Sequence, residues 1–231
     1  MIERYSITVS SQQITERFAV DVPETHQPRY NAAPAQLLPV ILLYSKGVSF
    51  FYWGEAPQWS KNKSLSEKLI NVRAEQIAEK PVLQKALKKN RCLIPADGFY
   101  GWKKVGKKTM VPYRFTLKSK QLFSIPGFWE EYDDENGEVF HTFTLITCEA
   151  NSFDGSITDR IPVVFDPEKE NVWMNPNTPQ EELIALLGCS ESERFDYYTI
   201  EPRINTTTVD DKSLIIPAPP ADQFGNLTLF D

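Results

Sequence analysis

The chain has 231 residues, of which 41% are hydrophobic and 24% charged, and its net charge is −6. These values are ordinary for a single globular domain, and they exclude a disordered, collagen-like or coiled-coil protein. No stretch approaches the roughly 20 apolar residues that span a bilayer, and residues 1–4 (MIER) do not begin a signal peptide, so we expect a cytoplasmic protein without membrane contact.

Hydrophobic runs separated by turn residues predict strands along most of the chain. Two apolar runs joined across 45–47 (SKG) are typical of a β-hairpin, and 133–137 (DDENG) predicts a turn between two later strands. The predicted strands are 36–44, 48–53, 113–117, 122–132, 139–148, 161–165 and 197–200.

Helices are predicted among these strands at 11–18, 66–78, 81–89 and 179–187. The last has the strongest local signals, because Thr178 can cap it, Pro179 opens it and Glu181 completes a capping box. Since strands dominate and helices interrupt them singly, the sequence predicts one α+β domain and not a doubly wound sheet. The tail from 218 to 231 is expected to be irregular.

Few residues suggest a standard catalytic or metal site. The three cysteines lie far apart and form no CxxC motif, which argues against a disulfide framework and against zinc. The two histidines, His26 and His141, are more typical of satisfied structural residues, and Cys92 lies in an apolar strand where a thiol is inert. There is no GxSxG, P-loop, GxGxxG or HExxH motif. We therefore expect no metal and no cofactor.

Charge is distributed unevenly along the chain. Residues 61–120 carry 16 Lys and Arg against four acidic residues, a local charge of +12, so the remaining 171 residues carry −18. A molecule polarised in this way can attract a polyanion to one face. The alternative is a solvated helix face with a lysine-rich turn and no partner, and charge alone leaves both interpretations open.

Several short clusters stand in a fixed order along the chain. They are 29–34 (RYNAAP), 53–59 (WGEAPQW), 71–75 (NVRAE), 91–102 (RCLIPADGFYGW), 127–130 (GFWE), 147–151 (TCEAN) and 159–162 (DRIP). This succession resembles the SRAP family, the SOS-response-associated peptidases or abasic-site processing proteins, from Arg4 to about Pro217. Each cluster alone is weak evidence, but their shared order predicts the fold of that family.

The resemblance implies one domain over 1–217, with a mainly antiparallel, barrel-like β core, a few peripheral helices and a groove for single-stranded DNA. In the family, an N-terminal cysteine attacks the aldehyde of an abasic site, and its thiol and α-amine close a thiazolidine ring. A glutamate, a histidine and an asparagine assist. These residue types fit the chemistry, because imine formation needs proton transfer and the opened sugar needs hydrogen bonds.

Three of the four reactive positions differ in this chain. Ile2 stands in place of the cysteine, Gly101 in place of the glutamate and Thr158 in place of the histidine. Only the asparagine is matched, by Asn71, which can bind the lesion or merely cap a helix. The resemblance therefore implies a catalytically degenerate member without the durable crosslink. A glycine at 101 can also adopt a positive φ, which would strain a glutamate there.

Other residues that match the family's clusters are candidates for DNA binding. Arginines can clamp phosphates, with structural ion pairs as the alternative, and tryptophans can stack on bases, with core packing as the alternative for Trp53. Asp97 and Asp159 are the nearest substitute acids, but both fit turn-stabilising roles better. The candidate set is Arg4, Asn31, Pro34, Trp59, Arg73, Glu75, Trp102 and Arg160.

We thus expect a monomer that binds single-stranded DNA, abasic sites included, and joins the nucleoid through that DNA. Two alternatives stay open. Because Ile2 is too large for methionine removal, Met1 is expected to remain, and its α-amine, with a pKa near ~7.7, could form a hydrolysable imine with an abasic aldehyde. The second alternative is a non-DNA interaction module that uses the acidic remainder of the surface. No residue set remains for the peptidase activity in the family's name.

Overall fold

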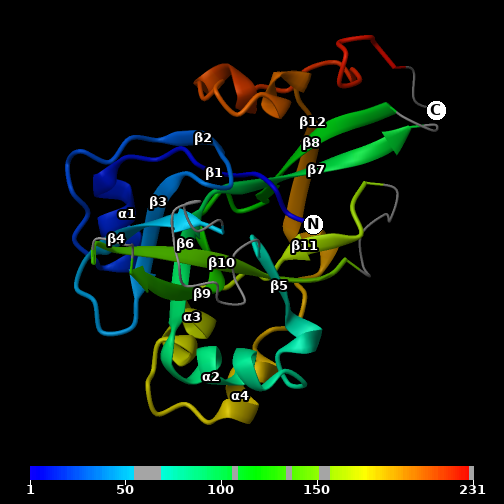
Figure 1. The fold of residues 1–231 in the computed structure, drawn as a ribbon. Helices are drawn as coiled ribbons and strands as arrows, with labels where there is room; N and C mark the ends of the chain where they lie inside the picture. The colour runs from blue at the N-terminus through cyan, green and yellow to red at the C-terminus, as the bar shows by residue number, and fades with distance from the viewer. Residues whose placement is uncertain (55–68, 106–108, 134–136, 151–156, 229–231) are drawn as a thin grey trace.

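A closed ring of five strands forms the core of the structure, a computed structural model that describes residues 1–54, 69–105, 109–133, 137–150 and 157–228 (Figure 1). The strands are hydrogen-bonded in the order β10–β4–β3–β6–β9, and β9 pairs again with β10 to close the ring. All these pairs are antiparallel except β10–β4, which is parallel. The bounds are β3 (Leu37–Leu42), β4 (Val48–Trp53), β6 (Arg91–Ala96), β9 (Phe123–Asp133) and β10 (Val139–Glu149).

Large apolar side chains on these strands have no exposed surface, among them Trp53, Ile94, Ile125 and Phe143. The rings of Trp53 and Phe143 are stacked, with centroids 6.4 Å apart. Burying a side chain of this size contributes about 1.5–3 kcal/mol, so this core is the main stabilisation of the ring. Two short strands pair with the C-terminal half of β10: β5 (Asn71–Arg73) runs parallel to it, and β11 (Arg160–Pro162) runs antiparallel.

A second sheet of five antiparallel strands holds the N-terminal strand in its interior. The ring of Phe99 stacks on Phe115 at a centroid distance of 4.9 Å, and Phe195 packs edge-on against Phe99. Aromatic packing therefore joins three strands of this sheet. The strand order is β12 (Phe195–Thr199), β8 (Thr109–Leu117), β7 (Gly98–Val105), β1 (Tyr5–Ile7) and β2 (Arg29–Ala32).

The helices of the described residues lie outside the sheets. Helices α2, α3 and α4 gather at one end of the molecule, and the β7–β8 hairpin projects at the other (Figure 1). No described helix is long and apolar enough to cross a membrane. The helices are α1 (Ser11–Phe18), α2 (Pro81–Lys89), α3 (Pro167–Trp173) and α4 (Gln180–Ala185), with 3-10 helices η1 (Ala74–Gln76), η2 (Ser192–Arg194), η3 (Pro202–Asn205) and η4 (Lys212–Ile215).

Elements with strong local signals form where the sequence predicts them. The predicted helices 11–18 and 81–89 coincide with α1 and α2. Ser10 and Gln13 form a capping box at the start of α1, and Pro81 opens α2. The predicted hairpin is formed by β3 and β4. The α+β class and the barrel-like core are confirmed.

Two predicted helices are wrong in type or in boundary. In the segment predicted as a helix over 66–78, residues 71–73 form β5, because their backbone pairs with β10; residues 66–68 lie outside the described part of the chain. Helix α4 is shorter than predicted and lacks the capping box. The Thr178 hydroxyl instead donates to the Val172 carbonyl at 2.7 Å, so it is not available to cap α4.

The expectation of no disulfide is also wrong. Cys148 and Cys189 are joined, with Cα atoms 5.6 Å apart. They are 41 residues apart in sequence, and only the folding of the chain between β10 and the end of α4 brings them together. No local spacing signals such a pair. Cys92 remains a free, buried thiol, and burial raises its pKa.

The carboxylate of Asp97 joins β1 to the β7–β8 hairpin. One oxygen accepts hydrogen bonds from Ser6 Oγ (2.6 Å) and Arg114 Nη2 (3.1 Å), and the other accepts from the Thr8 backbone N–H (2.9 Å) and hydroxyl. The Asp97 and Arg114 side chains are only 13% and 8% exposed. Burial lowers the pKa of Arg114, but the charge of Asp97 helps to hold that pKa above its ordinary value. Asp97 is therefore a structural residue.

Replacing this carboxylate is expected to destabilise the fold strongly. Asp97→Ala leaves Arg114 buried without its ion partner, and loss of one member of a buried pair typically costs about 3–5 kcal/mol. The matched control is Asp196→Ala, because the Lys120–Asp196 pair is 62% and 46% exposed and exposed pairs contribute about 0–1 kcal/mol. Urea denaturation of both variants measures the difference. Equal losses would contradict the role given to Asp97.

Candidate functional site

A cavity of about 630 Å³ opens where the N-terminus meets the β7–β8 hairpin, the segment before β11 and the end of η3. Four parts of the chain that are distant in sequence thus contribute to one concave surface. Its lining residues are Met1, Glu3, Arg4, Gly101, Trp102, Lys104, Met110, Ile157, Thr158, Asp159 and Asn205.

Position 2 is fixed by its backbone and its side chain at once. The Asn71 amide Nδ2 donates to the Ile2 carbonyl at 2.7 Å. Asn71 is the first residue of β5 and does not cap a helix. The Ile2 side chain is 1% exposed and belongs to the hydrophobic core. Met1 therefore faces the cavity, and its amine lies 3.8 Å from Asp159 Oδ1.

Gly101 and Thr158 are neighbours in the lining of the cavity. A Cβ added at Gly101 would lie 3.5 Å from Thr158 Cβ and 3.0 Å from Phe115 Cε2. Gly101 has no positive φ, unlike Gly54, so the expected backbone strain against a glutamate is absent. The Thr158 hydroxyl is already engaged, because it donates to the Arg160 carbonyl at 2.7 Å. The two positions thus lie side by side but carry no titratable group.

The cavity carries two basic side chains and one aromatic face. Arg4 is half-buried, its Nη1 donates to the Glu3 carbonyl at 2.7 Å, and its buried Nε has no hydrogen-bond partner within the described residues. Burial lowers the pKa of Arg4. Lys104 is exposed, and Trp102 is partly exposed with its Nε1 donating to Asn205 Oδ1 at 2.9 Å. Such a set can bind an anion beside a planar ring.

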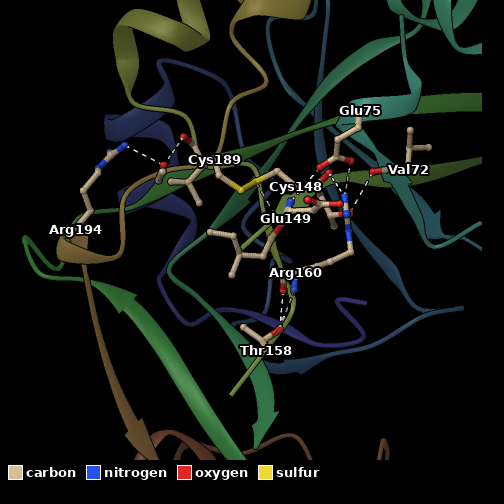
Figure 2. Close-up of a disulfide and its surroundings, with 12 residues drawn as sticks. Val72, Glu75, Cys148, Glu149, Thr158, Arg160, Cys189 and Arg194 are labelled. Carbon is tan, nitrogen blue, oxygen red and sulfur yellow. Dashed lines mark hydrogen bonds and ion pairs between the residues drawn. A yellow bond between two sulfur atoms is a disulfide. The ribbon is translucent and has the colours of Figure 1, made fainter. Parts of the chain in front are cut away.

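Glu75 and Arg160 lie together, but not in the lining of this cavity. The Arg160 guanidinium, 8% exposed, donates to Glu75 at 2.8 Å and to the Thr147 carbonyl at 2.8 Å. The Glu149 backbone N–H donates to the other Glu75 oxygen at 3.0 Å (Figure 2). This arrangement supports the structural alternative, in which the pair holds β11 against β10.

Asn31 is also placed structurally. It has no exposed surface, and its amide nitrogen donates to the carbonyls of Ile204, Thr206 and Val209 at 2.9–3.2 Å. In this structure the Asn31 side chain is thus engaged within the protein, and its predicted DNA contact stays a prediction. These hydrogen bonds hold the end of η3 and the segment after it against β2.

The remaining candidates are spread over different surroundings. Arg73 is exposed at the end of β5 and forms no ion pair with a described carboxylate. Pro34 is partly exposed in the turn after β2. Trp59 lies outside the described residues. Trp53 has no exposed surface and donates from Nε1 to the Ile70 carbonyl at 2.9 Å, which agrees with core packing.

The basic segment 61–120 does not form one face in the described part of the molecule. Lys88 belongs to α2 and Lys104 to the β7–β8 hairpin, and these two elements lie at opposite ends of the fold (Figure 1). Arg114, counted in the same segment, is buried. Of the described lysines of this segment, Lys104 lines the cavity.

Several lining residues carry no signal in the sequence. Met110 and Ile157 belong to no recognisable motif, and Asn205 reaches the cavity only because η3 packs against Trp102. Both histidines are satisfied elsewhere: His26 Nε2 lies 3.2 Å from the Val9 carbonyl, and His141 stacks on Phe51. Within the described residues, no group of His, Cys, Asp and Glu is arranged to hold a metal ion.

The ring, the second sheet and the polar cavity beside the N-terminus define a class of mixed β-barrel proteins. Residues 1–207 match the model of the family "SOS response associated peptidase (SRAP)", and the chain belongs to this family. A structure of a protein from Bacteroides thetaiotaomicron has a TM-score of 0.82 and 25% identity, covering 93% of this chain and 99% of that one.

Two bacterial relatives match most of the chain. It is 35% identical over 221 residues to "Abasic site processing protein YoqW" of Bacillus subtilis (strain 168), which covers 93% of this chain and 99% of the relative. It is 26% identical over 212 residues to "Abasic site processing protein YedK" of Escherichia coli (strain K12), covering 88% and 92%.

The Glu75–Arg160 pair is expected to make stability depend on pH. Burial raises the pKa of the Glu75 carboxyl, but hydrogen bonds from Arg160 and the Glu149 N–H outweigh this and hold the pKa below its ordinary value of 4.5. A depressed carboxyl pKa stabilises the folded state above that ordinary value and loses this contribution as the pH falls through the folded pKa.

Glu75→Gln should therefore lower the Tm at neutral pH, with a loss of about 1 kcal/mol because the carboxylate is partly exposed. The difference from wild type should shrink below about pH 4.5. Thermal unfolding of both proteins over a pH series is the measurement. A difference that widens in acid would contradict the electrostatic role of the pair.

Proposed function

We propose that this protein binds single-stranded DNA through the cavity and the base of the β7–β8 hairpin, without forming a durable crosslink to abasic sites. The observation that carries the proposal is that the half-buried Arg4 side chain and the partly exposed Trp102 line the same cavity. A guanidinium matches a phosphate, and an indole can stack on a base. The names of the relatives favour DNA as the polyanion.

Charge within the cavity is compatible with phosphate binding. Lys104 and Arg4 are basic, and Glu3 and Asp159 are acidic. The Met1 ammonium lies near Asp159 and offsets its charge. Short-range contacts to Arg4 and Lys104 therefore carry the binding, because the net field of the whole chain is repulsive at −6.

The absence of a durable crosslink follows from chemistry. A thiazolidine needs a thiol, and position 2 supplies a buried hydrocarbon. Proton transfer during imine formation needs an acid or base at the reacting atoms. The neighbouring positions 101 and 158 do not provide one, because Gly101 has no side chain and the Thr158 hydroxyl is hydrogen-bonded to the Arg160 carbonyl.

Binding is tested with a labelled single-stranded oligonucleotide, with and without an abasic site, by fluorescence anisotropy over a range of salt concentrations. The log–log slope should be about 0.7 per phosphate neutralised. Lys104→Ala should flatten this slope by about 0.7 and weaken binding for all sequences, because phosphate contacts carry no base information. Arg73→Ala should weaken binding in the same manner.

The matched control is Lys88→Ala, because Lys88 is also exposed and belongs to α2, at the far end of the molecule from the hairpin (Figure 1). Its affinity and slope should equal those of wild type. No binding even at about 50 mM salt, or equal effects of the Lys104 and Lys88 substitutions, would favour the non-DNA interaction module instead.

The missing chemistry can be rebuilt. Ile2→Cys with Gly101→Glu and Thr158→His should give a heat-stable adduct on abasic single-stranded DNA, whereas wild type gives none. The glutamate should raise the rate by roughly 10²-fold or more, since the backbone at 101 accepts a side chain if Phe115 yields by a few tenths of an ångström. The matched control carries Ile2→Ser and lacks only the thiol. A durable wild-type adduct would refute the degenerate assignment.

A second candidate activity is a transient imine. The proximity of the Met1 amine to Asp159, at 3.8 Å, favours it, and it requires that the mature chain starts at Met1, which intact mass measures. Borohydride would then trap wild type on abasic DNA, and Asp159→Asn would lower the yield. Without borohydride, this imine hydrolyses.

A further inference from the structure

The Cys148–Cys189 disulfide lies directly beside the Glu75–Arg160 pair (Figure 2). Cys148 belongs to β10 and is 4% exposed. Cys189 follows α4 and is exposed. The disulfide therefore fastens the chain after α4 to the C-terminal end of β10, where β10 pairs with β11.

The neighbours of Cys148 on both sides hold the ion pair. Thr147 accepts from the Arg160 guanidinium through its carbonyl at 2.8 Å and its hydroxyl at 3.3 Å. Glu149 donates its backbone N–H to Glu75 at 3.0 Å. Cys148 itself pairs with Ile161 in the β10–β11 register. A change at Cys148 thus acts on the strand whose preceding residues, Thr158 and Asp159, line the site cavity.

A separate cavity of about 430 Å³ gives access to the disulfide. It is lined by both cysteines and by Glu75 and Glu149, together with Ala74, Ala78, Ile184, Ala185, Leu187 and Gly188. An external thiol can enter this cavity and reach the sulfur of the exposed Cys189. Its lining is mostly apolar and lies between η1 and the end of α4, two elements that the disulfide keeps together.

We propose that Cys148–Cys189 is a reversible dithiol–disulfide site that regulates DNA binding by fastening segment 186–190 against β10 and so holding β11 in place. The regulatory part rests on the proposed DNA binding. In the oxidised protein the cavity wall formed by Thr158 and Asp159 is fixed. In the reduced protein segment 186–190 separates from β10, and this wall loosens.

The exchange can be written step by step. A thiolate of an external dithiol attacks Cys189 Sγ, the S–S bond breaks, and Cys148 leaves as a thiolate that takes up a proton. The second thiolate of the reagent then displaces Cys189, so two electrons and two protons pass from the dithiol to the protein. Hydrogen peroxide reverses the change. The Cys189 thiolate attacks one peroxide oxygen, the O–O bond breaks, the other oxygen leaves as hydroxide that takes up a proton to form water, and Cys189 becomes a sulfenic acid; the Cys148 thiol then condenses with that group, forming the S–S bond and releasing a second water.

Two arguments support a reversible disulfide: the exposure of Cys189, and the reducing compartment in which a DNA-binding protein works. Exposed disulfides exchange more readily than buried ones. Cellular compartments that hold DNA are kept reducing, and disulfides found there are usually transient and redox-sensing. The pair closes a loop between residues 41 apart, so opening it removes a constraint on the unfolded chain and lowers the stability of the fold.

The experiment treats native wild-type protein with a dithiol, then with hydrogen peroxide, and follows maleimide labelling by mass. Cys148 and Cys189 should become labelled after the dithiol and protected again after peroxide, whereas buried Cys92 stays unlabelled throughout. Reduction should lower the Tm by about 5–15 °C. Hydrogen exchange should rise in 180–190 and 158–162. Cys189→Ser, a substitution at an exposed position, should behave as the reduced protein in every condition.

In the DNA assay, reduction should weaken binding about fivefold or more, peroxide should restore it, and Cys189→Ser should not respond. A disulfide that yields only on global unfolding would overturn the proposal, because it would be a permanent staple. So would reduction that leaves exchange at 158–162 and DNA affinity unchanged. If neither redox state binds DNA while exchange at 158–162 still responds, the proposed function fails and the redox site stands.

Discussion

The carboxylate of Asp97 determines where the N-terminal strand lies. It binds Ser6, Thr8 and Arg114 at once, and this places β1 inside the second sheet, between β2 and β7. A free strand end would fray into solvent. Here Met1, Glu3 and Arg4 instead line the cavity, and the Arg4 carbonyl meets the β7–β8 hairpin at Tyr100. The site therefore depends on a buried ion pair that lies outside its lining.

Residues that match the family's motifs serve two different purposes in this fold. Arg160, Glu75 and Asn31 hold strands and segments together through buried or partly buried hydrogen bonds. Arg4 and Trp102 present free surface to the cavity. The first group stabilises the fold through side-chain hydrogen bonds of Arg160, Glu75 and Asn31 to partners other than the side chains at positions 2, 101 and 158. The second group is what makes a binding role chemically reasonable.

The sequence predicts elements whose causes are local and misses those whose causes are distant. Helix α1 follows from Ser10 and Gln13, which are neighbours in the chain. β5 follows from pairing with β10, so helical periodicity over 66–78 gives the wrong answer, as tertiary pairing overrides weak propensity. Motif order predicts which positions, 2, 101 and 158, correspond to the family's reactive residues, and the cavity lies beside them. Met110 and Asn205 could not be, because their place in the cavity depends on how the hairpin and η3 pack.

Asn31 binds carbonyl groups between Ile204 and Val209, and Asp210 binds the backbone N–H groups of Tyr30 and Asn31. Partners roughly three-quarters of the chain apart thus complete the second sheet. On a ribosome, which releases the N-terminal part first, β2 has to wait for its partners until residue 210 has emerged. Contacts of such high sequence separation slow folding. The molecule is therefore assembled as a whole after synthesis, and its cavity exists only once the last of these contacts has closed.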